Sequence, residues 1–420
     1  MKKITDFIEN IIAPPLTRLA ETRYLQAIQK TFMMTMPLLM FSSFFILIAA
    51  LPIPGWSGIV GPIIGPLWGG VNSTLGYIGL LVALLNGYYL GEHYNHNDKN
   101  VSPIATSVMS LIAFLIFFPM FTTENGVTAI ATANFGSTGI FTALLASIIA
   151  VEVYRFLIAK NITIKMPEGV PPMVVDAFTS LIPSFAVMFL AWLFSFIFKL
   201  DLPGLMNSIF APLVAAGSGP IAQFISFFID RILWFTGIHG SNVVSSVMSP
   251  VWINMIAKNI EAYQAGNVIP YLFTAEWCNY FIRISVFPIA LLASISTVKR
   301  YKTLGRLALP ASIFNIAEPV MFGLPIILNP ILFIPWVFGF SFLWLWTYIF
   351  TVLVPILPPI IAQVAWTVPA PISAYLATGG SIIALLFSLL NYVILGLIFL
   401  PFFKVLEKQE REKENSASKE

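Results

Sequence analysis

Two very long stretches without charge most constrain this sequence. Residues 31–91 and 319–403 contain no aspartate, glutamate, lysine or arginine. A membrane-spanning helix needs about 20 largely apolar residues, so each stretch has room for more than one crossing. A water-soluble fold would place charged side chains on its surface at shorter intervals. The chain is therefore expected to be an all-α polytopic membrane protein.

Composition excludes several other classes of protein. Charged residues are 10% of the 420 residues, against about 25% in soluble domains, and the mean hydropathy is +0.87. These values exclude a cytosolic enzyme and a disordered protein. The net charge of +3 is too small and too dispersed for binding to a nucleic-acid backbone. The single cysteine, Cys278, excludes an internal disulfide framework and a cysteine-based metal cage.

Other neutral runs fit further crossings, with boundaries good to several residues. The expected spanning segments lie near 28–51, 72–90, 101–121, 138–160, 176–199, 221–238, 274–298, 331–354 and 379–402. If the N-terminus is cytoplasmic, the cytoplasmic segments hold 18 of the 22 basic residues, and only Lys199 and Lys258 lie on the other side. This asymmetry predicts that both termini are cytoplasmic.

The first residues form an apolar stripe with helical spacing. The stripe covers residues 4–12, contains Asp6 and Glu9, and ends at Pro14 and Pro15. Its charges exclude a cleavable signal peptide. Two interpretations remain open, namely a helix lying in the membrane interface and a cytoplasmic helix packed on the bundle.

Two segments are too interrupted for simple spans. Residues 236–258 and 307–330 are apolar but broken by Gly, Pro, Ser and Asn, and each has one ionisable group near its centre. Non-helical backbone at membrane depth is tolerated only inside protein or beside a water-filled cavity. Paired interruptions of this kind indicate a transporter's binding site. A third, Pro-rich stretch, 358–380, is expected to line the same cavity.

Glu318 is the sharpest single signal, because it is the only charged residue between 307 and 403. A carboxylate at membrane depth is costly unless it is hydrated, paired or protonated, which favours a functional role. The alternative is a carboxylate that only satisfies backbone N–H groups. His239 lies in residues 237–242, a polar stretch rich in glycine. A lone histidine is often a satisfied core residue, but this flexible surrounding favours a ligand.

Aromatic residues suggest where a sugar ring would stack. Trp366, beside Thr367, is the main candidate, and Trp234, five residues before His239, is a weaker one. Other tryptophans of the C-terminal part are expected to face lipid or the membrane interface. They are Trp336, Trp344 and Trp346.

Three charged pairs within expected spans have structural explanations. They are Asp230 with Arg231, Glu152 with Arg155, and Glu276 with Arg283. The first pair is expected to bind groups elsewhere in the bundle, the second to pair locally at i,i+3, and the third to face one side of a helix. His93 and His96 fit a solvated turn better than a metal site. A phosphate-binding Gly-rich loop with a lysine is absent from the sequence, which argues against ATP hydrolysis.

At this point the motifs resemble those of a known family, the enzyme IIC subunits of the sugar phosphotransferase system. The lactose/cellobiose/diacetylchitobiose branch is the most similar. The motifs are Gly-Ile-His-Gly at 237–240, Asn-Ile-Ala-Glu-Pro-Val-Met-Phe-Gly-Leu-Pro at 315–325 and Pro-Ala-Pro at 369–371. The second motif is specific, whereas the first alone is weak. The resemblance covers essentially the whole chain.

The resemblance implies a homodimer of chains with about ten transmembrane helices, an N-terminal amphipathic helix and two re-entrant hairpins. The hairpins would lie near 236–258 and 307–330. Residues 1–200 would form the scaffold and dimerisation half, residues 201–403 the sugar-binding transport half, and residues 404–420 a cytoplasmic tail.

The resemblance also implies a permease in the bacterial plasma membrane. It would bind a β-linked disaccharide of the cellobiose or diacetylchitobiose type and carry it across by an elevator-like movement. The expected substrate-binding side chains are His239, Asn242, Asn315, Glu318, Trp366 and Trp234. His239 and Glu318 would also act on the hydroxyl that becomes phosphorylated, and Trp366 would stack on a ring. No cofactor, metal or nucleic-acid partner is expected.

In this family the phosphoryl donor is a reactive cysteine on a cytoplasmic IIB domain. Cys278 lies in an apolar segment, so a separate IIB subunit is expected as partner, and transferase activity would require it. Position and charge suggest Arg300, Lys302 and Arg306 as its docking residues.

Two other functions remain as alternatives. A proton- or ion-coupled secondary sugar transporter would use Glu318 as a proton site, and a proton gradient alone would drive sugar accumulation. A membrane-embedded hydrolase would use His239 and Glu318 with water. The sequence lacks the HExxH pair and any Ser or Asp triad signature, which disfavours the hydrolase.

Overall fold

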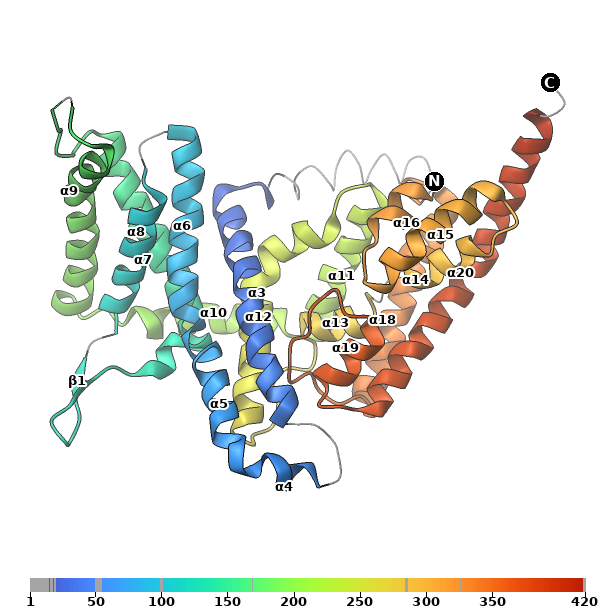
Figure 1. Ribbon diagram of the computed structural model, residues 1–420, viewed down its shortest axis with the longest axis horizontal. Helices are drawn as coiled ribbons and strands as arrows, with labels where there is room; N and C mark the ends of the chain where they lie inside the picture. Colours follow the sequence, from blue (N-terminus) through green and yellow to red (C-terminus); the bar gives the residue numbers. More distant parts are fainter. Residues whose placement is uncertain are drawn as a thin grey trace.

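The computed structural model of the chain is a predominantly helical molecule with two halves (Figure 1). It describes residues 20–49, 55–98, 101–118, 120–167, 169–283, 286–324 and 326–417, together with Pro15 and Arg18. Helices α3 to α9 lie on one side and α13 to α20 on the other, with α12 alongside α3. The apolar stripe expected at 4–12 lies outside the described residues.

Long helices build the N-terminal half. They are α3 (Arg23–Ala49), α6 (Ile78–Asp98), α7 (Pro103–Ile116), α8 (Ile140–Ala159) and α9 (Pro172–Trp192), which continues as a π-helical turn, Leu193–Ile197. The connections are α4 (Trp56–Val60), α5 (Ile64–Asn72), the 3₁₀ turns Gly61–Ile63, Leu75–Tyr77, Thr132–Phe135 and Ser137–Gly139, and a small antiparallel hairpin of β1 (Phe121–Thr122) and β2 (Thr128–Ala129). This hairpin is the one departure from helix and loop within the described residues.

Small residues bring α6 and α7 together. A Cβ added at Gly87 would lie 2.3 Å from Ser110 Oγ, and one at Gly91 would lie 2.0 Å from Thr106 Oγ1. Association of helices in lipid relies on such close packing, because lipid chains are as apolar as leucine side chains. Asn86 Nδ2 also donates to Ser147 Oγ at 2.7 Å, which connects α6 to α8.

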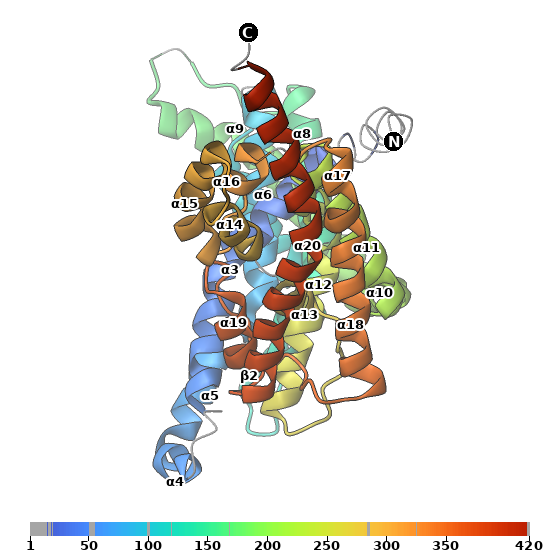
Figure 2. The same cartoon turned by 90° about the vertical axis from the view of Figure 1, so that its right-hand side faces the viewer.

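Shorter and more broken helices build the C-terminal half. They are α10 (Leu202–Gly217), α11 (Pro220–Phe235), α12 (Gly240–Gln264), α13 (Ala275–Phe281), α14 (Phe287–Ser294), α15 (Lys299–Ile313), α16 (Glu318–Gly323), α17 (Pro330–Phe333), α18 (Phe340–Tyr348), α19 (Ala370–Ala377) and α20 (Ile382–Ala417), with π-helical turns at Ile334–Gly339 and Ile349–Leu353. Helix α20 runs along this half, with α14 to α16 and α19 on one side and α17 and α18 on the other (Figure 2).

Membrane-spanning character is confirmed for most expected segments. Among the described residues, six helices are long and apolar enough to cross a membrane, or up to seven if the bent pair α10–α11 is one span. The six match the segments expected near 28–51, 72–90, 138–160, 176–199, 331–354 and 379–402. The segment expected near 101–121 contains α7, which is shorter, at 14 residues.

The hairpin expected within 236–258 is wrong. The chain is non-helical only at 236–239, and α12 is one helix of 25 residues that includes Pro250. Proline removes one helical hydrogen bond. Most residues of 250–260 are buried among neighbouring helices, so packing maintains the helix on both sides of this proline.

The span expected near 274–298 is not one continuous helix. Helix α13 ends at Phe281, and α14 begins at Phe287 with Pro288 in its first turn. Proline is well tolerated at a helix start, where its missing N–H has no helical partner. Arg283 lies in the break, and its Nε is 3.5 Å from Asp230 Oδ2. Arg283 therefore does not share a helix face with Glu276.

The two remaining interrupted segments both change direction. Helices α15 and α16 are separated by residues 314–317, where Asn315 has a left-handed φ of 62°. The stretch 358–380 runs without helix to Pro369 and returns through α19, and Ile361 N donates to Ala377 O at 2.8 Å. The position and direction of these segments relative to a bilayer belong to the proposal below.

Gly305 is predicted to be essential for the contact between α14 and α15. A Cβ there would lie 2.2 Å from Ser294 N and 2.4 Å from Ala293 C, both backbone atoms. Gly305→Ala should therefore destabilise the protein by about 2 kcal/mol or more. Thermal stability in detergent, measured by fluorescence-detected size-exclusion chromatography, checks this. The control is Gly65→Ala, where a Cβ has nothing within 4 Å; equal melting temperatures for both variants would contradict the prediction.

Candidate functional site

His239 and Glu318 lie side by side, although 78 residues separate them in the chain. His239 precedes α12, Glu318 begins α16, and His239 Nε2 is 3.8 Å from Glu318 Oε1. The two side chains are 42% and 49% exposed. They are therefore accessible to a ligand, and their distance is too long for a direct hydrogen bond.

The turn before α12 fixes the His239 ring. Asn242 N donates to His239 O at 3.0 Å and to His239 Nδ1 at 3.3 Å. Because Nδ1 accepts this bond, the neutral ring carries its proton on Nε2, which faces Glu318. Gly237 allows the turn with a φ of 86°, and a Cβ at Gly240 would lie 2.2 Å from Asp230 O.

Trp234 supports His239 from the side. The two ring centroids are 4.3 Å apart, and the Trp234 ring is buried. Trp234 Nε1 donates to Ser241 Oγ at 3.2 Å, and Ser241 Oγ donates to Asp230 Oδ1 at 2.7 Å. Trp234 thus contacts the site through His239 and presents little free surface.

Asp230 is a fully buried carboxylate at the base of this turn. Arg231 donates to its Oδ2 from Nε at 2.9 Å and from Nη2 at 2.6 Å, and Arg283 lies 3.5 Å away. Asp230 therefore pairs with its neighbour Arg231 as well as with Arg283, whereas only partners elsewhere in the bundle were expected. Burial of a carboxylate without such partners would be strongly unfavourable.

Trp336 and Trp344 are buried, so the expectation that they face lipid is wrong. Trp336 Nε1 donates to Arg231 O at 2.9 Å, and its ring lies 5.0 Å from the Arg231 guanidinium carbon. Such cation–π contact stabilises a buried cation. The local pair expected between Glu152 and Arg155 is confirmed, at 3.5 Å.

Asn315 joins α15 to the third interrupted segment. Its Nδ2 donates to Trp366 O at 2.6 Å and to Val368 O at 2.8 Å. Asn315 is three residues before Glu318, so these bonds bring Trp366 to the same part of the structure. The Trp366 side chain is 55% exposed, which leaves its ring available for stacking.

Several polar side chains that sequence reasoning missed satisfy the irregular backbone at 360–364. Asn259 Nδ2 donates to Ile360 O at 3.0 Å, and the Tyr280 hydroxyl bonds to both N and O of Val364 at 2.9 and 3.0 Å. Ser43 Oγ, from α3, accepts from Gln363 N at 2.8 Å. The available sequence signal was weak, namely uncharged polar residues in otherwise apolar runs.

The chain is similar to known proteins. The family model described as "Phosphotransferase system, EIIC" matches residues 29–339. The chain belongs to this EIIC family. A phosphotransferase EIIC is a multi-pass membrane protein, in agreement with the candidate spans described above.

Relatives extend over nearly the whole EIIC chain. It is 33% identical to the lichenan permease IIC component of Bacillus subtilis (strain 168), with 99% of this chain and 96% of the relative covered. It is 31% identical to the cellobiose-specific EIIC component of Geobacillus stearothermophilus, with 99% and 97% covered. It also matches the crystal structure of the transporter ChbC, the IIC component of an N,N'-diacetylchitobiose-specific phosphotransferase system, with a TM-score of 0.89, 32% identity, and 97% and 99% covered.

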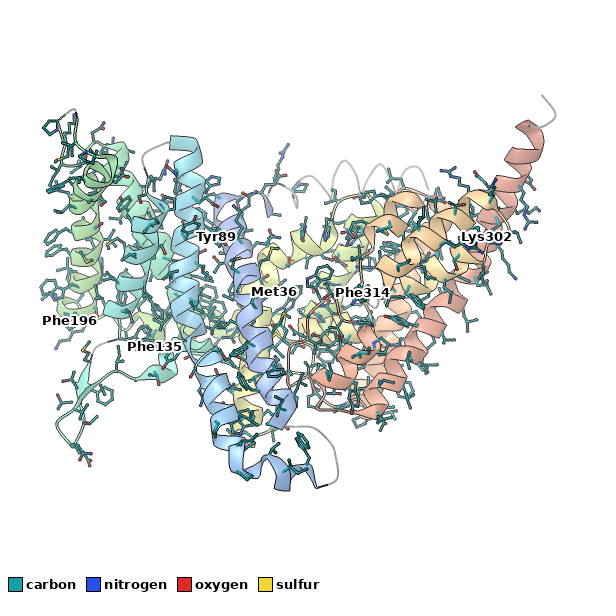
Figure 3. The ribbon with its side chains drawn as sticks, viewed as in Figure 1. Met36, Tyr89, Phe135, Phe196, Lys302 and Phe314 are labelled. Carbon is teal, nitrogen blue, oxygen red and sulfur yellow. The ribbon has the colours of Figure 1, made fainter. Side chains whose placement is uncertain are left out.

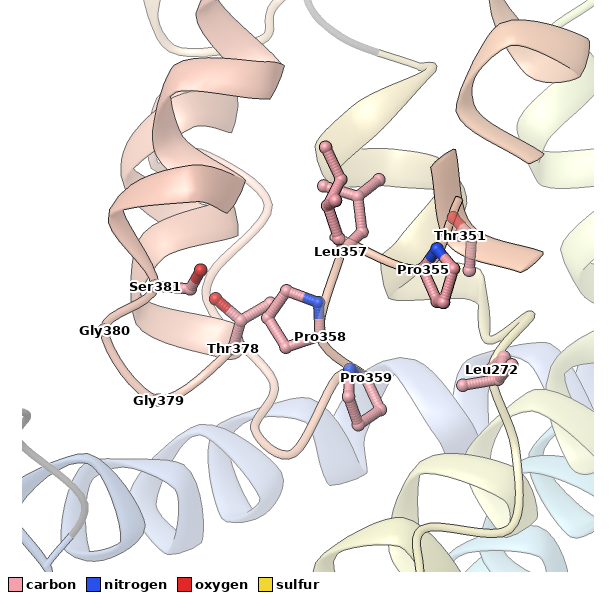
Figure 4. A pocket seen from close by; sticks show the side chains of 11 residues that line it. Leu272, Thr351, Pro355, Leu357, Pro358, Pro359, Thr378, Gly379, Gly380 and Ser381 are labelled. Carbon is pink, nitrogen blue, oxygen red and sulfur yellow. The ribbon is translucent and has the colours of Figure 1, made fainter. Parts of the chain in front are cut away.

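A separate cavity of about 630 Å³ opens elsewhere in this EIIC protein (Figure 4). Its lining residues are Leu272, Thr351, Pro355, Ile356, Leu357, Pro358, Pro359, Thr378, Gly379, Gly380 and Ser381. They include none of the six candidate residues. The cavity lies where the segment 358–380 leaves and rejoins the helices, so it adjoins the two ends of that segment and is not lined by Trp366.

The amide of Asn315 is predicted to be essential for this EIIC site. Asn315→Asp keeps the side-chain shape and tolerates the positive φ but replaces the donor by an acceptor facing two carbonyl groups. Sugar affinity, measured by calorimetry, should fall by about tenfold or more.

Asn329→Asp is a matched control for that substitution. Asn329 acts through its oxygen, which accepts from Ile331 N at 2.9 Å, and aspartate can replace it in this role. Affinity should stay near the wild-type value. An equal loss in both variants would show that the Asn315 amide has no special role.

Proposed function

We propose that this EIIC chain binds a β-linked disaccharide of the cellobiose or diacetylchitobiose type and carries it across the plasma membrane for phosphorylation by a separate IIB subunit. The observation that carries the proposal is the His239–Glu318 pair, to which Asn315 joins the segment of Trp366. The names of the relatives, which specify lichenan, cellobiose and diacetylchitobiose, support this sugar class.

One sugar hydroxyl fits between the two side chains. His239 Nε2–H would donate to the hydroxyl oxygen, and the hydroxyl would donate to Glu318 Oε1. Atoms 3.8 Å apart can both reach one oxygen at hydrogen-bond distance. The carboxylate makes the stronger bond because it is charged, so this pair would select and orient the hydroxyl that reacts.

The other candidate residues would recognise the rest of the sugar. The exposed Trp366 ring would cover one apolar face of a pyranose ring. Asn242, exposed in the first turn of α12, would bond to a further hydroxyl or to an N-acetyl group. These contacts supply orientation and specificity, as few polar groups in an apolar site usually do.

Phosphoryl transfer would take place at the same hydroxyl. Its oxygen would form the new O–P bond while the S–P bond to the IIB cysteine breaks, and Glu318 would take up the hydroxyl proton. His239 would keep the oxygen aligned with the phosphorus atom, since positioning dominates such reactions. Once Glu318 has lost this proton to solvent, its carboxylate lies next to the new negative charge of the product, and this repulsion promotes release.

Transport would move the C-terminal half against the N-terminal half of a homodimer. The loop before α9, the start of α15 and the end of α20 lie at one end of the molecule, opposite α4 and the β1–β2 hairpin (Figure 1). The first three carry about half of the basic residues of the described part, which supports a cytoplasmic location for that end and for both termini. Helices α15–α16 and the segment 358–380 would be the re-entrant elements.

Glu318→Ala is predicted to weaken sugar binding by at least about tenfold, because the hydroxyl loses its charged partner. Calorimetry on detergent-purified protein with cellobiose, diacetylchitobiose, lactose and glucose, without an ion gradient, measures this. Glu124→Ala, on an exposed turn, should bind like the wild type. An affinity of Glu318→Ala within about twofold of wild type would exclude Glu318 as a ligand.

Uptake into proteoliposomes separates this proposal from ion-coupled transport. A permease of the phosphotransferase system should accumulate sugar phosphate only with phosphoenolpyruvate, the phosphocarrier proteins and IIB. Accumulation of unmodified sugar on a proton gradient alone would instead support the secondary transporter.

The docking surface for IIB would include the exposed basic face of α15. Lys302 lies on α15 near α20 (Figure 3), and Arg306 follows one turn later. Both side chains are exposed. Arg300, the third docking candidate, pairs with Glu410 at 3.2 Å, so Lys302 and Arg306 are the better test.

Lys302→Glu with Arg306→Glu is predicted to slow phosphorylation of bound sugar by IIB at least tenfold at low salt, since like charges repel an acidic partner surface. Sugar affinity should not change, because both side chains are exposed on α15 and neither is one of the six candidate sugar-binding residues. Lys199→Glu, in the loop before α10, serves as control. Unchanged phosphorylation in the double variant would remove this surface from the docking site.

A further inference from the structure

Glu276 is a second buried carboxyl group in the C-terminal half. It lies in the first turn of α13, and the residue is 5% exposed. Among the described residues, no lysine, arginine or histidine nitrogen lies within 4.0 Å of it. Glu276 therefore differs from Asp230, whose charge is balanced by two arginines.

The hydrogen bonds of Glu276 are incomplete if it is ionised. Gln363 Nε2 donates to Glu276 Oε1 at 3.2 Å. Glu276 Oε2 is buried without a partner, and Gln363 Oε1 is also buried without a partner. The Thr274 hydroxyl and the backbone N–H of Glu276 also lie near this carboxyl group, but neither gives Glu276 Oε2 or Gln363 Oε1 a hydrogen bond of good geometry. Two buried acceptors without a donor are unfavourable in an apolar surrounding.

A single proton satisfies both atoms. A carboxylic acid has one O–H donor and one carbonyl acceptor, and a primary amide has the complementary set. The N–H···O bond from Gln363 to Glu276 Oε1 is one half of such a pair. We infer that Glu276 is a neutral carboxylic acid whose Oε2–H donates to Gln363 Oε1.

This acid–amide pair would position the sugar-binding segment. Gln363 N donates to Ser43 Oγ, the next residue bonds to Tyr280 through its backbone, and Trp366 follows three residues after Gln363. Gln363 is therefore held through both its backbone and its side chain, and it lies in the non-helical stretch that carries Trp366. Glu276 acts through Gln363 and is a positioning residue, with no expected contact to sugar.

The inference rests on the proposed function only where sugar affinity is the readout. The protonation state of Glu276 is independent of that function, and it determines which substitutions at 276 are tolerated. Glutamine at 276 can replace the acid, because its amide N–H can donate to Gln363 Oε1. Alanine cannot, and it leaves the Gln363 amide without either bond.

The test compares Glu276→Gln and Glu276→Ala by calorimetry with the disaccharide that binds the wild type. Affinity should stay within about twofold of wild type for Glu276→Gln and fall about fivefold or more for Glu276→Ala. Gln363→Ala should show a similar loss, and combining it with Glu276→Ala should add little, since both remove the same pair. A large loss in Glu276→Gln would overturn the inference, because it would show that the ionised carboxylate is needed.

Infrared spectroscopy provides a readout that does not depend on sugar. The wild type should show a carbonyl-stretch band of a protonated carboxylic acid at neutral pH, and Glu276→Gln should lack it. Absence of a difference band would contradict a protonated Glu276 even if Glu276→Ala fails to fold. If the wild type binds no sugar but shows the band, the proposed function fails and the protonation state stands.

Discussion

The structure depends on satisfying irregular backbone inside an apolar bundle. In a bilayer, water is not available to bond with exposed N–H and C=O groups, so each must find a partner in the protein. The stretch 360–368 has few helical bonds of its own. Side chains from several other elements replace them, as described for Asn259, Tyr280 and Asn315. A non-helical segment at this depth therefore requires a set of surrounding amides and hydroxyls.

Two buried carboxyl groups avoid an uncompensated negative charge in different ways. Asp230 keeps its charge and binds Arg231 and Arg283, and this cluster fixes the turn that presents His239. Glu276 has an amide as its partner, and the proton inferred there removes the charge. Glu318 belongs to neither class, because it is half exposed and can be hydrated until a ligand arrives.

The candidate site residues could be predicted from the sequence where they belong to residue types that are rare in apolar runs. Glu318 and His239 stood out because ionisable groups are scarce in apolar runs, and the structure brings them together. Long uncharged runs likewise predicted most of the spans. The sugar-binding role of Trp366 and the division of the chain into two functional halves stay predictions.

Sequence reasoning failed where the outcome depends on packing. Gly, Pro and Ser within 236–258 predicted a broken segment, but burial of the following residues keeps α12 continuous through Pro250. Trp336 is a tryptophan in a long apolar run, which is typical of a lipid-facing residue, yet its ring packs against the Arg231 guanidinium. Gln363 and Asn259 are ordinary polar residues whose importance appears only when the backbone they bond to is known.

The C-terminal part of α20 has a practical consequence. Glu407 Oε1 accepts from Thr297 N at 3.0 Å and from the Ser296 hydroxyl, which attaches α20 to the loop before α15. Because it is attached at two levels, with Glu410 one turn later, this end of α20 forms a stiff extension of the C-terminal half. A spin label at the exposed Lys404 would therefore convert any rotation of the C-terminal half into a measurable change in distance to a label on the N-terminal half.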